Sequence, residues 1–287
     1  VYRRCRTPHH RLLRLIRPTH IARSDEVFWE PAARFINHRK LDGIDAVIHL
    51  AGEPVFGRWN DRKKEAIYNS RVAGTGLLAA ALAALEPKPN VFLCASAVGW
   101  YGHSGQADVT ENTPPGDTFL ARVCRDTEAA AQTAAHAGIR VVNLRFGMVL
   151  GHAGGALAKM LPLFKAALGG PLGDGTQWVS WISLPDCVGA IDFALTNEKL
   201  AGPVNITAPE PVRNSELTRT LGNILHRPER LTVPKKILRL RFGQMADELL
   251  LASTRARPEK LIRSGYTFPH PDLNTALQNI LPHAHPG

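Results

Sequence analysis

Residues 44–52, IDAVIHLAG, form an apolar run that ends in small residues. Two later stretches share this pattern, VFLCAS at 91–96 and IRVVNLRFG at 139–147. Apolar runs of this length are typical of strands that are buried on both faces of a parallel sheet. In open sheets of this kind ligands bind at the carboxyl ends of the strands, where small residues let a flat molecule approach the backbone. The three runs therefore predict a ligand-binding sheet edge.

Segments with helical spacing separate these runs. Apolar residues recur at helical intervals over 62–85, which predicts a helix. A second helix is expected over 117–137, where the sequence becomes rich in alanine, and Gly138 is suited to end it. A third helix is expected over 156–168. Alternating strands and helices up to about residue 195 predict an α/β fold, with helices packed around a doubly wound parallel sheet.

The alternation of strands and helices gives way to mostly helical segments near residue 200. A short strand is expected at 202–206, and helical segments follow at 215–225, 238–251 and 269–282. We therefore expect two units, a sheet domain over 1–200 and a small, mostly helical cap over 201–287. Such a cap would lie over the carboxyl edge of the sheet, where the ligand crevice of this architecture is found.

Composition narrows the class of protein. The four cysteines are scattered without metal-binding spacing, which favours a reducing compartment, the cytoplasm, and no metal site. No apolar run reaches the roughly 18–20 residues of a membrane-spanning helix, so we expect no membrane partner. The net charge of +10 is concentrated in residues 1–24, which hold seven arginines and no acid, and in 227–241. Neither basic stretch interleaves aromatic residues, which argues against nucleic acid as a partner.

Taken together, the motifs resemble the extended short-chain dehydrogenase/reductase superfamily, within its NAD-dependent epimerase/dehydratase group and the YfcH-like epimerase branch. The pieces that carry the resemblance run in order along the chain: HLAGEP at 49–54, RWNDRKKEAIYNSRVAGT at 58–75, SAVGWYG at 96–102, TENTPPGDTFLARVCRDTE at 110–128, LRFGMVLGHAGGAL at 144–157, GGPLGDGTQWVSWISLPD at 169–186, GPVNITAPEPV at 202–212 and RPEKL at 257–261. The resemblance implies a Rossmann-like fold that binds a nicotinamide dinucleotide.

The sequence departs from this superfamily at two places. The resemblance implies a first strand and a glycine-rich loop at a helix N-terminus, which holds the pyrophosphate. We expect that strand and loop to lie outside the 287 residues. The superfamily also uses a Tyr-x-x-x-Lys pair, but Leu120 and Cys124 stand at those positions, as is general in the YfcH-like branch. Neither side chain can replace a tyrosine activated by a lysine.

Candidate cofactor residues lie where the predicted strands end. Arg17 follows an expected strand at 12–16, where a guanidinium would pair with the 2′-phosphate of NADP(H), unless it is an ordinary surface arginine. NADP(H) is therefore the preferred cofactor, and NAD(H) stays open. Arg71 would reach a phosphate or brace its helix. The other candidates lie at the ends of the three apolar runs: Leu50, Ala51, Gly52, Ala95, Arg145 and Phe146.

Candidate catalytic residues are Ser96 and Tyr101, which follow the second apolar run. Ser96 would orient a substrate carbonyl, and Tyr101, or water, would supply a proton. Without the lysine we expect the pKa of Tyr101 to stay near the reference value of about 10. The alternative is that Ser96 only caps the strand end and that Tyr101 packs beneath the substrate.

The residues and the resemblance predict an epimerase/dehydratase-like or reductase-like protein. It would transfer hydride between NADP(H) and a small substrate, such as a nucleotide-sugar-like molecule. The competing hypothesis is a non-catalytic NADP(H)-binding sensor or partner-binding module, which Leu120 and Cys124 favour. The sequence leaves open whether the chain forms a homodimer.

Overall fold

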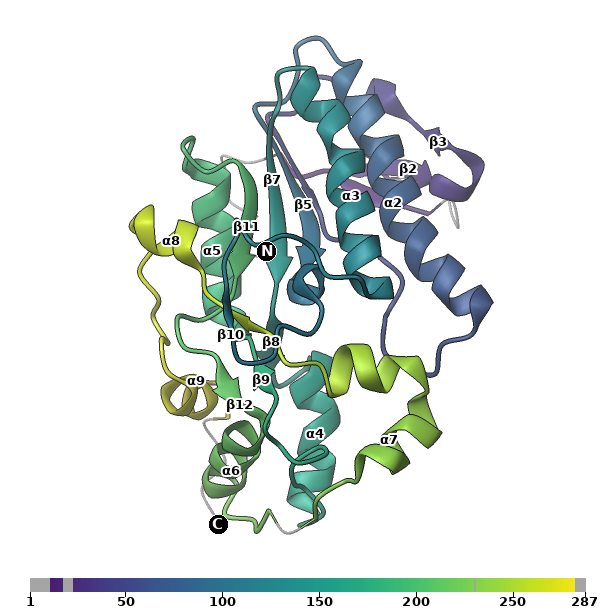
Figure 1. The fold of residues 1–287 in the computed structure, drawn as a ribbon. Coiled ribbons are helices and arrows are strands. Elements are labelled where there is room, and N and C mark those ends of the chain that lie inside the picture. The colour runs from purple at the N-terminus through teal and green to yellow at the C-terminus, as the bar shows by residue number, and fades with distance from the viewer. Residues whose placement is uncertain (1–10, 18–22, 230, 282–287) are drawn as a thin grey trace.

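Four parallel strands form the centre of the structure, a computed structural model that describes residues 11–17, 23–229 and 231–281 (Figure 1). The basic opening of the chain therefore lies mostly outside the described residues. The strands lie in the order β11-β7-β5-β4. Their bounds are β4 (Ala46–His49), β5 (Val91–Ala97), β7 (Arg140–Phe146) and β11 (Gly202–Ile206). Each of the three predicted apolar runs is therefore a strand of one parallel sheet.

Helices cover both faces of this sheet. On one face α2 (Asp61–Ala83) and α3 (Phe119–His136) pack against Phe92 and Val141. On the other face α5 (Leu184–Thr196) packs against Leu93 and Val142. Successive strand residues point to opposite faces, so a sheet covered on both sides needs the continuous apolar runs of the sequence. The predicted doubly wound, Rossmann-like α/β fold is confirmed.

Local sequence explains where the two covering helices begin. The side chain of Asn60 caps α2 by accepting a hydrogen bond from the backbone N–H of Lys63 at 2.8 Å. Thr118 caps α3 in the same way through the N–H of Ala121 at 3.1 Å. Gly138, with φ of +89°, follows the last turn of α3 in the left-handed conformation that terminates helices. Both helices are thus fixed by local residues at their ends.

A smaller sheet lies beside the central one. It contains β1 (Arg14–Ile16), β2 (Glu26–Glu30) and β3 (Phe35–Ile36), with β1 parallel and β3 antiparallel to β2. Leu15 of β1 and Val47 of β4 pack against the same apolar cluster. Within the described ranges β1 and β4 are each the outermost strand of their sheets. The strand and glycine-rich loop implied by the resemblance are not among the described elements.

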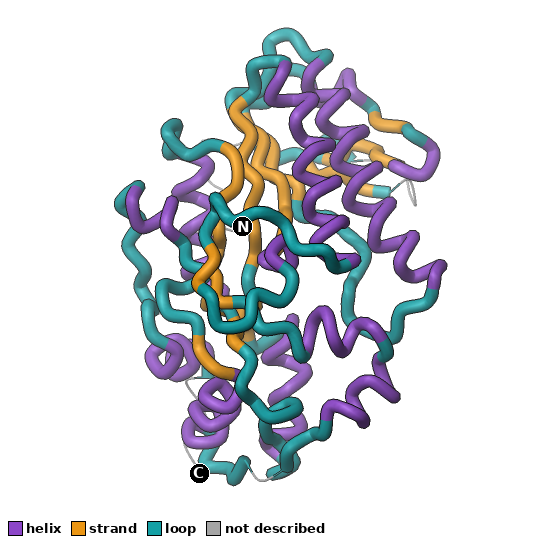
Figure 2. Tube along the Cα trace, viewed as in Figure 1, coloured by secondary structure: helices purple, strands orange, loops and turns teal. Residues whose placement is uncertain are grey.

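The elements that carry a second apolar cluster gather beyond one end of the central sheet (Figure 2). Its helices α4 (Gly155–Lys165), α6 (Asn214–Ile224) and α9 (Leu273–Ile280) surround β8 (Met148–Gly151) and β10 (Trp181–Ser183). The remaining short strands and α-helices are β6 (Asp108–Val109), β9 (Trp178–Val179), β12 (Val212–Arg213), α7 (Lys235–Phe242), β13 (Arg255–Ala256) and α8 (Glu259–Arg263). β11 begins beyond residue 200 and still extends the central sheet. The division into two units at that residue stays a prediction.

One helix prediction is wrong. The sequence favoured a continuous helix over 238–251, but α7 ends at Phe242 and a single π-helical turn, Ala246–Leu250, follows it. Gly243 separates the two with φ of +60° and ψ of −139°, values outside the helical region. Amphipathic spacing continues across the glycine, so the pattern alone does not reveal the break.

Candidate functional site

The carboxyl ends of β5 and β7 bring the predicted catalytic residues together. The register of the sheet places Ser96 beside Arg145 and Ala97 beside Phe146. Beyond β5 a turn of 3-10 helix, Val98–Tyr101, carries Tyr101 back over the end of the sheet. These residues lie at the sheet edge where ligands bind in this architecture.

A buried ion pair forms the centre of this site. The Arg145 guanidinium donates to both carboxylate oxygens of Glu128, from Nε at 2.8 Å and from Nη2 at 2.9 Å. Arg145 is 2% and Glu128 6% exposed. Burial by itself lowers the pKa of Arg145, but the hydrogen bonds and charge of Glu128 outweigh it and raise that pKa above its usual value. Arg145 also lies over the Trp100 ring, with 3.8 Å from Cζ to the ring centroid. The guanidinium is thus held charged and immobile.

The hydroxyl of Ser96 belongs to the same network. Ser96 Oγ donates to Glu128 Oε1 at 2.7 Å. Because its single proton is committed to the carboxylate, Ser96 can only accept a hydrogen bond from a further ligand. The arrangement differs from the expected one, in which Ser96 donates to a substrate carbonyl.

Tyr101 is braced on two sides. Its hydroxyl donates to Asn205 Oδ1 at 2.7 Å and accepts from Arg145 Nη1 at 3.1 Å. Burial raises the pKa of Tyr101 to about 12, against the opposing effect of Arg145. The expected pKa near 10 is therefore wrong, because the sequence could not reveal how deeply the phenol is buried. In this arrangement the phenol is neutral at physiological pH and its proton is engaged within the protein.

The positions of the superfamily's tyrosine and lysine are apolar here. Leu120 packs in a cluster with Trp59 and Met245. The Cys124 thiol points at the Ala97 carbonyl oxygen, 3.6 Å away, and burial raises its pKa to about 11. Neither position can exchange a proton with a ligand at neutral pH.

A carboxylate from the C-terminal part of the chain covers the start of the helix that carries these positions. Glu248 accepts hydrogen bonds from the backbone N–H groups of Phe119 at 3.2 Å and Leu120 at 2.8 Å. These N–H groups have no partner within the helix, and a negative charge is favourable at a helix N-terminus. The contact fixes α3 against the π-helical turn Ala246–Leu250.

Arg71 and Gly52 form a second group, at the end of β4. A Cβ added to Gly52 would lie 3.0 Å from Arg71 Cζ, so glycine lets the guanidinium lie directly against the backbone. Arg71 Nη1 donates to the carbonyl oxygens of Glu53 at 2.9 Å and Ile67 at 3.4 Å. Burial lowers the pKa of Arg71. Among the described residues, the hydrogen bonds of Arg71 go to backbone carbonyl groups and none goes to a carboxylate. Such a half-buried cation is suited to an incoming phosphate.

The remaining predicted residues are placed differently. Leu50 and Ala51 are exposed just beyond β4, Ala95 lies within β5, and Phe146 packs at the edge of the core between the sheet and α5. Arg17 follows β1 of the three-stranded sheet, where it forms an ion pair with Glu30. Its Cζ lies 5.5 Å from the centroid of the Trp29 ring.

The prediction of site residues missed Glu128 and Asn205, which hold Ser96, Arg145 and Tyr101. One signal could have identified Glu128. It is the only charged residue among the eight buried positions of α3, and a buried acid needs a partner. Asn205, inside β11, offers no comparable signal.

Comparisons with known proteins agree with this architecture. A sequence model described as the NAD-dependent epimerase/dehydratase family matches residues 29–207. The chain belongs to that family. Residues 233–280 match a domain of unknown function, DUF1731.

Several relatives of this epimerase-family chain cover most of its length. "Epimerase family protein Mb2239" of Mycobacterium bovis is 41% identical over 273 residues, which is 95% of this chain and 90% of the relative. A chloroplastic SDR39U1 homologue of Arabidopsis thaliana is 40% identical over 243 residues, 84% of this chain and 70% of the relative. The crystal structure of human epimerase family protein SDR39U1 with NADPH superimposes with a TM-score of 0.81 at 32% identity, covering 84% of this chain and 83% of the human one.

Composition led to two expectations, one about membrane-spanning helices and one about the state of the cysteines. None of the described helices is long and apolar enough to cross a membrane. Cys94, Cys124 and Cys187 are all free thiols. The cytoplasmic compartment inferred from the cysteines stays a prediction.

Proposed function

We propose that this chain binds NADP(H) at the carboxyl edge of its central sheet. The observation that carries the proposal is the pairing of Gly52 with Arg71. The glycine makes room for a half-buried guanidinium. Among the described residues no carboxylate bonds to Arg71, and the charge of Glu53 acts on it only from a distance. Burying a cation is unfavourable unless it meets an anion, so the place is suited to a phosphate group of the cofactor. The related human SDR39U1, whose crystal structure is one with NADPH, supports the same cofactor.

Preference for NADP(H) over NAD(H) is assigned to Arg17. It lies at the end of β1 with its guanidinium half exposed, so it can leave Glu30 for a 2′-phosphate. A phosphate would bind both arms of the guanidinium, and NAD(H) offers no such group.

If the chain is catalytic, we propose hydride transfer with a small hydroxyl-bearing substrate. NADP(H) would supply the hydride acceptor or donor. Ser96 would accept a hydrogen bond from the substrate hydroxyl, since its own proton is held by Glu128. Arg145 holds Glu128 in place by two hydrogen bonds. Solvent takes up the substrate proton, because the Tyr101 hydroxyl is already engaged with Asn205. A nucleotide-sugar-like molecule fits this description, as do other alcohols.

A second candidate function is a non-catalytic NADP(H)-binding sensor or partner-binding module. The apolar surroundings of Leu120 and the engaged hydroxyl of Tyr101 favour it, because neither offers a proton to a ligand. This hypothesis predicts tight cofactor binding without turnover of any alcohol or carbonyl compound.

Titration with NADPH and NADH, followed by tryptophan fluorescence and melting temperature, tests cofactor binding. We expect saturable binding that favours NADPH, and an Arg17→Ala variant that loses about tenfold in NADPH affinity but keeps its NADH affinity. Arg219→Ala, at an exposed position of α6, is the matched control. Absence of binding to either nucleotide would contradict the proposal. A panel of alcohols with NADP⁺ and of carbonyl compounds with NADPH then separates the enzyme from the sensor.

A further inference from the structure

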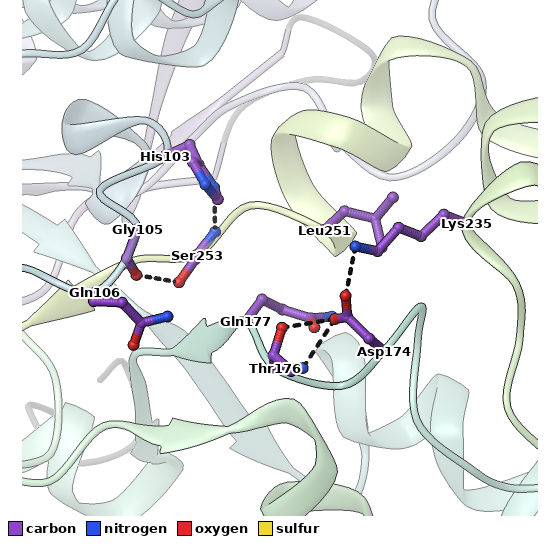
Figure 3. A pocket seen from close by; sticks show the side chains of 9 residues that line it. All are labelled: His103, Gly105, Gln106, Asp174, Thr176, Gln177, Lys235, Leu251 and Ser253. Carbon is purple, nitrogen blue, oxygen red and sulfur yellow. Dashed lines mark hydrogen bonds and ion pairs between the residues drawn. The ribbon is translucent and has the colours of Figure 1, made fainter.

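A separate polar pocket of about 250 Å³ lies between the loop after Tyr101 and segments from the later part of the chain (Figure 3). Residues 103–106 form one wall, the turn at 174–177 another, and the start of α7 with residues 251–253 closes it. None of the residues assigned to NADP(H) lines this pocket. The kind of ligand that the pocket can bind depends on which of its polar atoms are already hydrogen-bonded within the protein.

Two residues of the first wall present hydrogen-bond donors. The side-chain oxygen of Gln106 accepts from Trp178 Nε1 at 3.2 Å and also from Arg213, which leaves the amide nitrogen for a ligand. Figure 3 shows that nitrogen directed toward the middle of the pocket. His103 Nδ1 accepts the backbone N–H of Ser253 at 3.0 Å, so a neutral His103 carries its proton on Nε2, a second donor.

The opposite wall adds a cation. Lys235 Nζ bonds to Asp174 Oδ2 at 2.7 Å and keeps two further N–H groups. The other oxygen of Asp174 already accepts two hydrogen bonds from Thr176, from N at 3.1 Å and from Oγ1 at 2.7 Å. In Figure 3 the Lys235 ammonium faces the pocket from the side opposite Gln106.

The pocket has few acceptors to balance these donors. Gln177 donates its amide nitrogen to the carbonyl oxygens of Leu172 and Leu250, each at 3.1 Å, which leaves one side-chain oxygen. Donors from Gln106, His103 and Lys235 therefore outnumber the two side-chain acceptors that keep capacity, Gln177 Oε1 and Asp174 Oδ2.

The charge around the pocket is also positive. Lys235 and Asp174 neutralise one another, but Arg213 adds a charge directly behind the wall. Arg213 donates to Thr176 O and to Gln106 Oε1 and lies over Trp178, with 4.0 Å from Cζ to the ring centroid. Within the described ranges, no ion pair joins Arg213 to a carboxylate. Surplus donors with surplus positive charge are the features that recognise an oxyanion.

We infer that this pocket binds the oxyanion of a small molecule, a carboxylate or a phosphate ester. Lys235 provides ammonium donors and Arg213 behind the wall provides the net positive charge, while Gln106 and His103 provide directional hydrogen bonds. Asp174 competes with the ligand for Lys235 and so keeps the affinity moderate. The assignment does not depend on cofactor binding, because the two groups of residues are distinct.

Calorimetric titration in a buffer free of phosphate and carboxylate tests the inference. The probes are ribose 5-phosphate, citrate and ribose. We expect binding of a phosphate or carboxylate probe and none of ribose, which shares the sugar of ribose 5-phosphate but lacks the oxyanion. Comparison of the first two probes identifies which oxyanion is preferred. Binding of ribose as tight as that of ribose 5-phosphate, or no binding of any probe up to about 10 mM, overturns the inference.

Four variants locate the binding. Lys235→Met and Gln106→Leu should each weaken it by about tenfold or more, whereas Lys236→Met, one position along α7, should leave it unchanged. Asp174→Asn should tighten binding, because it removes the competing carboxylate; a merely structural role of the Asp174–Lys235 pair predicts no such gain. Affinity that is insensitive to Lys235→Met and Gln106→Leu shows adventitious binding elsewhere and overturns the assignment. The same variants are also titrated with NADPH, and we expect their NADPH affinity to equal that of the parent chain. This second titration distinguishes a failure of the pocket assignment from a failure of the proposed cofactor binding.

Discussion

Ser96 at the end of β5 donates its hydroxyl proton across 2.7 Å to the carboxylate of Glu128 in the middle of α3. Arg145 binds both oxygens of the same carboxylate, so three donors converge on one buried acid. The network fixes the direction of the Ser96 hydrogen bond and joins the sheet edge to the helix that covers it. The same side chains, Ser96, Glu128 and Arg145, therefore determine both the chemistry of the candidate site and the stability of the fold around it.

Replacing Ser96 by alanine should separate these two roles. Glu128 keeps its two bonds to Arg145, so the free energy of unfolding should fall by only about 1 kcal/mol. Turnover of any alcohol that the parent chain oxidises should fall at least about a hundredfold, with NADPH affinity within about twofold of the parent. Denaturant unfolding, fluorescence titration and a steady-state assay measure the three quantities, and Ser264→Ala serves as control. Unchanged turnover would show that Ser96 only caps the strand end.

Replacing Glu128 by glutamine should have a much larger effect on stability. It leaves the Arg145 charge buried at 2% exposure without a counter-ion, which costs about 3–5 kcal/mol. The double variant Glu128→Leu with Arg145→Met removes both charges and should recover most of that loss. Urea unfolding of the parent, single and double variants gives the comparison. A single variant within about 1 kcal/mol of the parent would be inconsistent with an ion pair that stays dry.

Gly52→Ala tests the cradle for the cofactor phosphates. The added Cβ would lie 3.0 Å from Arg71 Cζ, so the guanidinium must shift by a few tenths of an ångström. We expect NADPH affinity to fall by about tenfold while the melting temperature stays near that of the parent, because the displaced group is a side chain. Gly154→Ala is the matched control, since nothing lies within 4 Å of its added Cβ. Equal NADPH affinity in the two variants would remove Arg71 from the binding site.

The sequence predicts the sheet better than the site. Strands β4, β5 and β7 are recognisable because burial on both faces leaves an apolar run in consecutive residues. The ends of those strands also identify Ser96, Tyr101 and Arg145, which the structure joins through one network. Such features are local in sequence, so composition and spacing reveal them.

The partners of these residues are not local. Ser96 and Glu128 are separated by 32 residues, and Tyr101 and Asn205 by 104. No spacing rule connects positions so far apart, and the depth of Tyr101, which decides its pKa, depends on all of them. The break between α7 and the π-helical turn was missed for another reason, because one glycine interrupts a helix without interrupting its apolar spacing.

The buried cysteines should be inert in the folded chain. Burial raises the pKa of Cys94 and Cys187 to about 12 and that of Cys124 to about 11. In a Cys5→Ser background, we expect no reaction of these three thiols with a disulfide reagent at pH 8, and reaction of all three after unfolding in urea. Above about pH 9 the thiols of the unfolded chain ionise, whereas those of the folded chain do not. The free energy of unfolding should therefore fall as the pH rises through this range. Rapid labelling of the native chain at pH 8 would contradict this account.

His49 should make the fold sensitive to acid. It lies at the end of β4, 4% exposed, between Trp29 and Phe92, and burial together with the charge of Arg71 lowers its pKa from 6.5 to about 4. Protons therefore bind the unfolded chain more readily than the folded one, and the stabilisation present above pH 6.5 is lost as the pH falls toward 4. The loss attributable to His49 should reach about 2 kcal/mol at pH 5 and about 3 kcal/mol at pH 4.

Urea unfolding of the parent chain and of His49→Gln at pH 7.5, about 5 and about 4 measures this contribution. The variant loses packing and starts from a lower stability, but its dependence on pH should be shallower than that of the parent by the amounts above. His38→Gln removes an exposed imidazole and should retain the steep dependence of the parent. Parallel pH profiles for the parent and His49→Gln would mean that His49 is solvated in the folded chain, since only a desolvated imidazole resists protonation so strongly.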